Sequence, residues 1–270
     1  MLKKIIKFFI NLLPEGTYAQ KFYDNIFLLL LFKMNIGKGA NTKDSGEIKV
    51  LNYVKRKLSG SIDEIIIFDV GANIGDYTQS VVDVFSENQI KVYAFEPSKQ
   101  TYDKLSLRFK DNNSVIINNT GLSDISKEIE LFSDSELSGL ASVYNRNLKH
   151  FGKEFQNVEL VSLKNIKEFC NENNIYKIDF LKLDVEGHEF SILKGAEEMF
   201  NNNQIKFIQF EFGGCNIDSR TYFQDFFYLL SDKFRIYRIL KNGLYPIENY
   251  REINEIFITT NFFCELKSGI

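Results

Sequence analysis

The chain has 270 residues with a formal net charge of −3, and 44% of its residues are hydrophobic and 26% charged. These values exclude a wholly disordered chain and suit one large domain with a buried core. The slightly acidic balance argues against broad attraction to nucleic acid, so we expect no nucleic-acid partner. The three cysteines, Cys170, Cys215 and Cys264, form no CxxC pair, which favours a reducing, cytoplasmic compartment over a disulfide scaffold or zinc site.

The first 38 residues are basic and apolar, with six lysines against Glu15 and Asp24. The apolar run 26–32 is far shorter than the ~20 residues that a bilayer-spanning helix needs, and no cleavable signal is evident. Two interpretations stay open for residues 1–38: helices packed on the domain or on a second subunit of a homo-oligomer, or peripheral contact with the inner face of a membrane. We therefore expect an N-terminal helical extension over residues 1–48.

From residue 64 onward, short β-branched runs alternate with helical patterns. The expected strands cover 64–70, 90–96, 114–120, 158–163, 178–185, 205–212, 234–240 and 255–260, and the expected helices cover 75–86, 97–110, 164–173, 189–200 and 219–230. Asn242-Gly243 is a strong hairpin signal, so the last strands should be antiparallel. This alternation predicts an α/β fold, doubly wound around a mostly parallel sheet, in a domain over residues 49–270.

Acidic residues end four of the expected strands. They are Asp69 in FDVGANIGDYT, Glu96, the group Asp184, Glu186 and Glu189 in LDVEGHE (which also holds His188), and Glu211. Ligands of open α/β sheets bind beyond the carboxyl ends of the strands. We therefore expect these side chains around one crevice.

The spacing of the first two strand ends limits the ligand. Glu96 lies 21 residues past Gly75, which suits hydrogen bonds to ribose hydroxyls. The turn is G-x-x-x-G, without the third glycine of a pyrophosphate site, and no P-loop motif occurs. Asp69 beside this turn would orient an ammonium group, directly or through water. A nucleoside with an amino-acid moiety, S-adenosylmethionine, fits better than NAD.

The segments FDVGANIGDYT, YAFEPS, NTGLSD, IDFLKLDVEGHEFSILKGA and FEFG together resemble the FkbM family of S-adenosylmethionine-dependent methyltransferases over residues 65–214. The resemblance implies a Rossmann-like class I fold with seven strands, the last antiparallel. It also implies cofactor-binding roles for Asp69, Gly71, Asn73, Gly75, Glu96, Gly121, Leu122, Ser123 and Asp124. Lys164 departs from the family, which usually has an acidic residue there.

Methylation of a sugar hydroxyl needs alignment and a base, because the hydroxyl pKa is far above neutrality. Asp184, Glu186 and His188 form the compact group that could supply this base, and an unperturbed histidine titrates near neutrality. Alternatively, Asp184 and Glu211 would hold Mg²⁺, which lowers the pKa of a bound hydroxyl. The sequence leaves both mechanisms open.

The resemblance implies O-methylation of a sugar in a glycan or glycolipid acceptor, in a bacterial surface-polysaccharide pathway. Two alternatives stay open: an NAD-dependent oxidoreductase or epimerase, and a catalytically inactive interaction domain. The missing third glycine counts against the first. The joint presence of Asp69, Gly71, Gly75 and Glu96 counts against the second.

Overall fold

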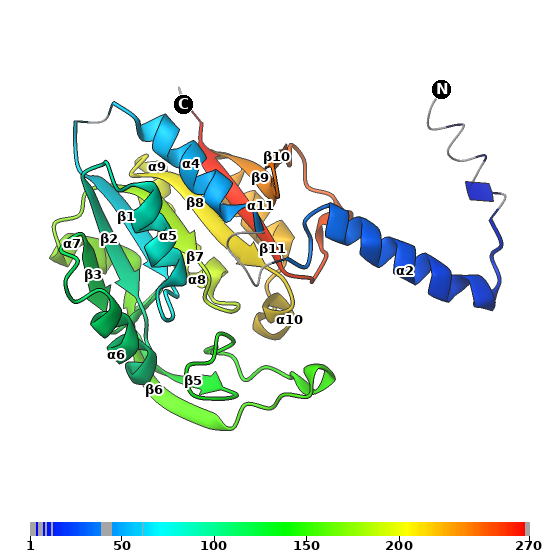
Figure 1. The fold of residues 1–270 in the computed structure, drawn as a ribbon, viewed down its shortest axis with the longest axis horizontal. Coiled ribbons are helices and arrows are strands. Elements are labelled where there is room, and N and C mark those ends of the chain that lie inside the picture. Colours follow the sequence, from blue (N-terminus) through cyan, green and yellow to red (C-terminus); the bar gives the residue numbers. More distant parts are fainter. Residues whose placement is uncertain are drawn as a thin grey trace.

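The computed structural model describes residues 4, 8, 10, 11, 13–38, 45–60 and 62–267. Within these residues, eight strands form one mixed sheet with helices on both faces (Figure 1). Their spatial order is β10 (Gly243–Pro246), β9 (Phe234–Leu240), β11 (Thr260–Leu266), β8 (Ile205–Phe212), β7 (Ile178–Leu183), β1 (Ile65–Val70), β2 (Ile90–Phe95) and β3 (Val115–Asn118). The Rossmann-like methyltransferase fold is confirmed, and the short edge strand β10 adds to the seven strands expected.

Strand direction divides the sheet into two parts. β3, β2, β1, β7 and β8 run parallel, whereas β11 is antiparallel to both of its neighbours, β8 and β9. The hairpin signal is also confirmed, because Gly243 pairs with Leu240 across the β9–β10 turn. The carboxyl ends of the five parallel strands therefore meet at one edge of the sheet.

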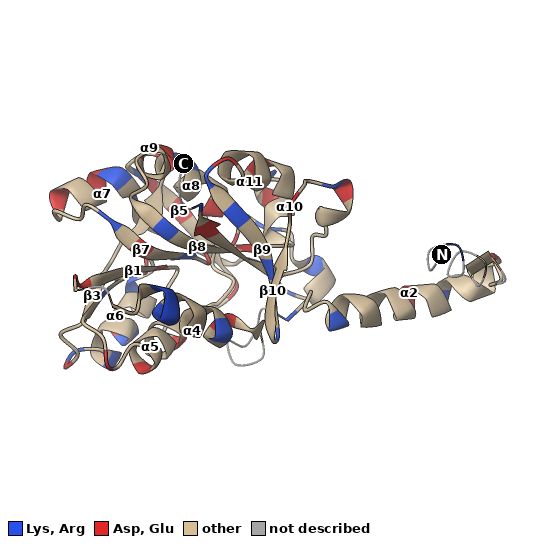
Figure 2. Ribbon diagram, turned by 90° about the horizontal axis from the view of Figure 1, so that it is seen from above, with Lys and Arg blue, Asp and Glu red and all other residues tan. Residues whose placement is uncertain are grey.

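Helices form a layer on each face of this sheet (Figure 2). One layer contains α4 (Glu47–Leu58), α5 (Asp76–Val84) and α6 (Lys99–Arg108), and the other contains α7 (Ile166–Glu172), α8 (Glu189–Gly195), α9 (Glu197–Asn201) and α11 (Phe223–Leu230). Successive strand residues face opposite sides. In β1, Ile67 packs in the first layer and Phe68 in the second, which explains its continuous apolar run.

The expected last strand over 255–260 is wrong, because the strand begins where that range ends. Glu255 instead accepts hydrogen bonds from the backbone N–H groups of Phe223 and Gln224, at 2.8 and 2.9 Å, and so caps α11. The first five residues of the true strand β11 are all buried, with Phe262 packed on one face of the sheet and Phe263 on the other.

Two expected helices are interrupted. The helix expected over 219–230 begins only at Phe223, as α11, because Ser219 is the last residue of another short helix, α10 (Cys215–Ser219), which Arg220 ends in a left-handed conformation. The helix expected over 189–200 divides at Ala196 into α8 and α9.

Two further parts lie outside the main sheet. Strands β4 (Gly121–Ser123), β6 (Asn157–Asn165) and β5 (Lys127–Ser133) form a second sheet beside the carboxyl edge. Helix α2 (Thr17–Lys33) extends away from the domain, as expected for an N-terminal helical extension (Figure 1). Among the described helices, none is both long enough and apolar enough to span a bilayer.

Candidate active site

The glycine loop after β1 is pressed against the end of β7. Gly71 has a φ of +81°, and a Cβ there would lie 1.8 Å from the carbonyl oxygen of Asp184. Gly75 has a φ of +89°, and a Cβ there would lie 2.5 Å from the ring of Phe109 on the turn after α6. Both positions therefore require glycine, because a side chain would be strained and would collide with its neighbour.

Glu96 joins the end of β2 to this loop. Its carboxylate accepts hydrogen bonds from the backbone N–H groups of Asn73 and Ser98, both at 3.0 Å. Burial raises the pKa of Glu96 to about 7, although the two N–H donors oppose that rise. The side-chain oxygen of Asn73 is buried without a hydrogen-bond partner in the described part of the chain. A wall rich in hydrogen-bond acceptors therefore lies where we expect the ribose of the cofactor.

Asp69 and Lys182 form a buried pair behind the loop. Asp69 is fully buried; one carboxylate oxygen accepts from the Thr78 hydroxyl at 2.6 Å, and the other lies 3.5 Å from the Lys182 ammonium. Lys182 also lies 3.2 Å from Asp184, whose side chain is 39% exposed. Asp69 lies behind the cavity wall and supports the loop; its expected contact with an amino-acid moiety stays a prediction.

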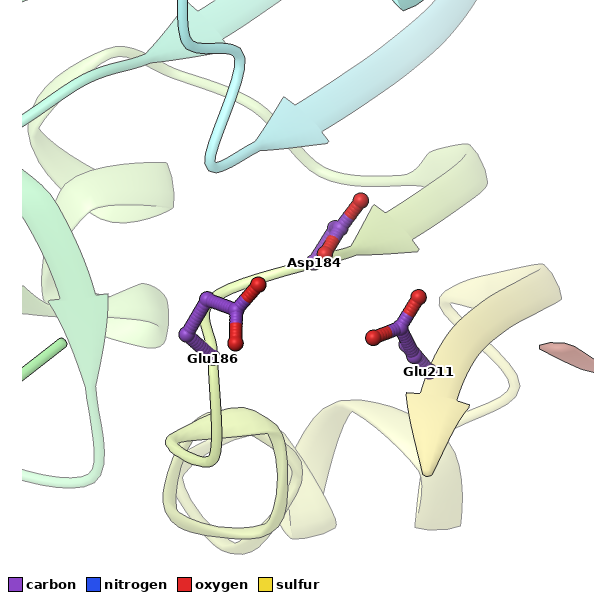
Figure 3. A group of neighbouring side chains, drawn as sticks. All are labelled: Asp184, Glu186 and Glu211. Carbon is purple, nitrogen blue, oxygen red and sulfur yellow. The ribbon is translucent and has the colours of Figure 1, made fainter. Parts of the chain in front are cut away.

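Three carboxylates converge at the ends of β7 and β8 (Figure 3). Asp184, Glu186 and Glu211 each offer an oxygen within 4.8 Å of the others. Glu186 has a φ of +52°, and its loop is held by Glu189, which accepts from the N–H groups of Val185 and Gly187. The sequence prediction of an acidic cluster at these strand ends is therefore confirmed, and Glu186 joins the pair that was expected to hold a metal.

Burial and mutual repulsion control the charge of this trio. Burial and the nearby Asp184 raise the pKa of Glu186, and the same causes raise the pKa of Glu211. Arg146 opposes the rise at Glu186, because it forms a buried ion pair with that carboxylate and lies 3.5 Å from Asp218. The donor chemistry of the trio suits a hard cation, while Lys182 and Arg146 already place positive charge beside it.

His188 does not keep the near-neutral pKa of an exposed histidine. Its ring is buried, with Nε2 at 2.9 Å from the Ser123 hydroxyl and Nδ1 at 3.1 Å from the Tyr144 hydroxyl. Burial, reinforced by Lys127, lowers the pKa of His188 to about 4. Because both nitrogens have protein partners, His188 is better placed to hold the site together than to take a proton from an acceptor, and its role as a base stays a prediction.

This burial predicts a pH-dependent loss of stability. The unfolded chain binds a proton at His188 below about pH 6.5, and the folded chain does so only below about 4. His188 therefore contributes stability above pH 6.5 that is lost as the pH falls. Between pH 7 and 4.5 we expect the free energy of unfolding in urea to fall by roughly 2–3 kcal/mol more for the wild type than for His188→Gln. Equal pH dependence in the two proteins would contradict the buried, neutral ring.

These elements enclose a cavity of about 70 Å³. It is lined by Val70, Gly71, Asn73, Glu96, Pro97, Gly121, Leu122, Leu131, Ser138, Gly139, Ala141, Val143, Leu163, Asp184, Val185, Glu186 and His188. Ligand sites typically measure ~300–1,000 Å³. Part of the wall is the loop 134–144, which is tied down where the Ser142 hydroxyl donates to the carbonyl oxygen of Glu186 at 2.7 Å. We expect this loop to move outward when a nucleoside enters.

A sequence profile described as "Methyltransferase FkbM domain" matches residues 69–240, more than half of the chain. The chain belongs to the FkbM methyltransferase family. The match begins at Asp69 and ends at the last residue of β9, so it includes every strand end and loop described above.

Curated relatives of this FkbM protein are distant. It is 27% identical to hexuronic acid methyltransferase AglP of Haloferax volcanii over 147 residues, covering 53% of this chain and 55% of the relative. It is 29% identical to methyltransferase sdnD of Sordaria araneosa over 158 residues, covering 49% and 60%. The chain thus spans little more than half the length of these relatives.

Solved structures with this arrangement include methyltransferase FkbM of Methylobacillus flagellatus KT, with 17% identity, a TM-score of 0.44 and coverage of 78% of this chain and 47% of that one. SMU.1697c of Streptococcus mutans, solved with SAH, is 12% identical with a TM-score of 0.43 and coverage of 82% and 97%. At these scores we draw nothing further from the likeness.

The structure brings together most of the site residues expected from the sequence of this FkbM protein. Gly71, Asn73, Glu96, Gly121 and Leu122 line the cavity with the three expected catalytic residues. Asp69, Gly75, Ser123 and Asp124 lie outside the lining that the described residues form. Ser123 instead donates to Asp124 at 2.9 Å and contacts His188, so the pair supports the wall from behind.

Three residues of the site escaped the sequence reasoning: Lys182, Tyr144 and Arg146. Lys182 carried a signal, because a lysine within the apolar strand IDFLKLDV needs a buried partner. Tyr144 and Arg146 lie in the polar segment 121–157, where no motif or periodic pattern distinguishes them from the surface residues around them.

Proposed function

We propose that this FkbM methyltransferase transfers the methyl group of S-adenosylmethionine to a sugar hydroxyl of a surface-polysaccharide or glycoconjugate intermediate. The observation that carries the proposal is the joint placement of the glycine loop, Glu96, Asp184 and Glu186 around one cavity, with Glu211 next to the last two. Family membership sets aside the NAD-dependent alternative that the sequence left open. The relative named as a hexuronic acid methyltransferase supports a sugar acceptor.

Each wall of the cavity has a proposed role toward the cofactor. When bound, S-adenosylmethionine supplies an electrophilic methyl group on a sulfonium. Glu96 would accept hydrogen bonds from the ribose hydroxyls, with Gly121 and Leu122 near the adenine. The loop residues Gly71 and Asn73 would lie along the amino-acid moiety, because both line the cavity together with Asp184.

The carboxyl groups of the site suit a hydroxyl acceptor better than a carboxylate acceptor. A carboxylate has no proton to lose before it is methylated, so the cluster of Asp184, Glu186 and Glu211 would have no task as a base. A hydroxyl needs a group that takes its proton. Asp184 suits this role best, because its side chain is 39% exposed and its carboxylate lies 3.2 Å from the Lys182 ammonium. We propose that Asp184 accepts the hydroxyl proton while Glu186 and Glu211 orient the sugar.

Calorimetric titration with S-adenosylhomocysteine tests the cofactor assignment. We expect micromolar binding by the wild type and no binding of NAD. We expect Glu96→Gln to weaken binding by about 1–3 kcal/mol, because a buried carboxylate that accepts from hydroxyl groups is replaced by an amide. The exposed residue Glu128, on the second sheet, provides the matched control Glu128→Gln, which should bind like the wild type. Binding of neither ligand by folded protein would favour the inactive-domain alternative.

We also propose that the enzyme acts in the cytoplasm, at the inner face of a membrane that carries a lipid-linked acceptor. The basic composition of residues 1–38 supports this location. Self-association through the same segment stays a prediction.

A further inference from the structure

Helix α2 leaves the domain as an arm whose base is fixed (Figure 1). Leu31 is buried at this base. The Asn35 amide donates to the carbonyl oxygens of Ser45 and Ile239 at 2.6 and 3.2 Å, and the N–H of Gly37 donates to Thr259 at 2.8 Å. The arm therefore has a defined direction relative to the catalytic domain.

Apolar side chains project on all sides from the half of this arm that is nearest the domain. Large side chains that are 38–65% exposed are Phe22, Ile26, Phe27, Leu28, Leu29, Leu30 and Phe32. The run 26–30 alone exceeds one helical turn of ~3.6 residues, so it presents apolar surface in every direction. A helix that is apolar all round is stable when its surroundings are apolar on all sides. A single globular partner would cover only one side.

The dimensions and charges of the arm match a lipid leaflet. The apolar run 26–32 is ~10 Å long, far shorter than the ~30 Å hydrocarbon core, so it can enter one leaflet without crossing the bilayer. Lys33 and Lys38 lie at its base, and the Lys38 ammonium is 3.7 Å from the centroid of the Phe32 ring. Lysines at this level suit the anionic headgroup region.

A groove of about 490 Å³ opens where the arm meets the domain. Phe27, Leu31 and Met34 of the arm line one part, and Arg238 and Arg251 line another. Nε of Arg238 is buried and, within the residues that the structure describes, has no hydrogen-bond partner. Glu248 also lines the groove, but no ion pair joins it to either arginine in the described part of the chain. A guanidinium that lies over the Tyr245 ring, has no hydrogen-bond partner at Nε and stands beside apolar side chains suits a lipid phosphate with its acyl chains.

We propose that α2 is a membrane arm: it inserts obliquely into one leaflet of an anionic bilayer, and the groove at its base holds a lipid phosphate through Arg238. This proposal goes beyond methyl transfer and does not depend on it. It supplies a physical reason for a methyltransferase to keep an apolar helix away from its own core.

Flotation of the full chain with vesicles tests the arm. We expect the wild type to float with vesicles of phosphatidylglycerol and phosphatidylcholine in equal parts, and more weakly with phosphatidylcholine alone. The variant with Leu28→Ser, Leu29→Ser and Leu30→Ser should lose at least about tenfold in partition coefficient. The matched control carries Leu107→Ser, Ile125→Ser and Leu160→Ser, at positions 54–68% exposed on the catalytic domain, and should float like the wild type.

Further measurements separate the possible outcomes. Arg238→Gln should lose the preference for phosphatidylglycerol while still floating weakly, and binding of S-adenosylhomocysteine should persist in every variant. If the wild type fails to float, or the arm variant and the control float equally, the membrane arm is refuted. An oligomer in size-exclusion chromatography that the arm variant alone converts to monomers, without flotation, would assign the arm to a second copy of this chain. Loss of cofactor binding with intact flotation would refute the proposed function and leave the arm standing.

Discussion

Replacing Asp184 by Asn is expected to lower kcat for methyl transfer at least about 100-fold, because a general base contributes roughly 10²–10⁴ in rate. The amide keeps the shape of the carboxylate but cannot take the hydroxyl proton. Affinity for S-adenosylhomocysteine should stay within about threefold of the wild type, since the ribose and adenine contacts are proposed for other residues. Turnover of labelled S-adenosylmethionine with aryl glucosides and aryl glucuronides as acceptors measures the effect.

His188→Gln provides the comparison that separates the two candidate bases. Both His188 nitrogens contact protein hydroxyls, so we expect this variant to keep at least about a tenth of the wild-type kcat. Its pH–rate profile should keep the wild-type shape, because the buried ring is neutral above about pH 4. A larger fall in His188→Gln than in Asp184→Asn would transfer the role of base to His188.

The same methyl-transfer assay tests whether the enzyme requires Mg²⁺. Lys182 lies 3.2 Å from Asp184 and Arg146 pairs with Glu186, so the trio already has cationic partners. We therefore expect activity to persist in EDTA. Activity that EDTA abolishes, that Mg²⁺ restores and that Glu211→Gln also abolishes would establish the metal mechanism instead.

The features of the site that the sequence predicts are those whose structure depends on one short stretch of residues. The turn around Gly71 and Gly75 follows a buried strand, and both glycines have the positive φ that such a turn requires. Glu96 ends the next strand, and the parallel order of the two strands brings it to the loop.

The parts that were missed depend on contacts between distant segments. The pKa of His188 follows from burial by β4 and by Tyr144, neither of which is close to it in the sequence. The start of β11 was misplaced because the β-branched residues before it resemble a strand, while Glu255 is used as a helix cap. The ion pair of Arg146 with Glu186 depends on the path of a long loop, and no pattern in the sequence of that loop predicts its path.

Replacing Lys182 by Met is expected to produce the largest loss of stability. Burial by itself lowers the pKa of Lys182, but Asp184, Asp69 and Glu47 together hold it above its ordinary value. Removing the ammonium leaves the buried carboxylates of Asp69 and Glu47 without the cation that both share. Breaking a buried ion pair by removing one partner typically lowers the free energy of unfolding by roughly 3–5 kcal/mol. Urea unfolding at pH 7 measures this loss, and the surface pair Lys167–Glu198 supplies the control Lys167→Met, which should lose less than about 1 kcal/mol.

The pH dependence of the stability loss in Lys182→Met shows whether the loss comes from the missing charge or from poor packing of the methionine. Burial raises the pKa of Glu47 and the Lys182 ammonium opposes that rise, so without the ammonium the folded variant binds a proton at Glu47 that the unfolded chain releases. Its stability deficit should therefore shrink as the pH falls from 7 to 5. The additional change Asp69→Asn should restore part of the loss at pH 7 for the same reason. A deficit that is equal at both pH values would mean that Met fails to pack. A deficit that shrinks at low pH would establish that Lys182 balances the charge of two carboxylates: Asp69, behind the glycine loop, and Asp184, the proposed base.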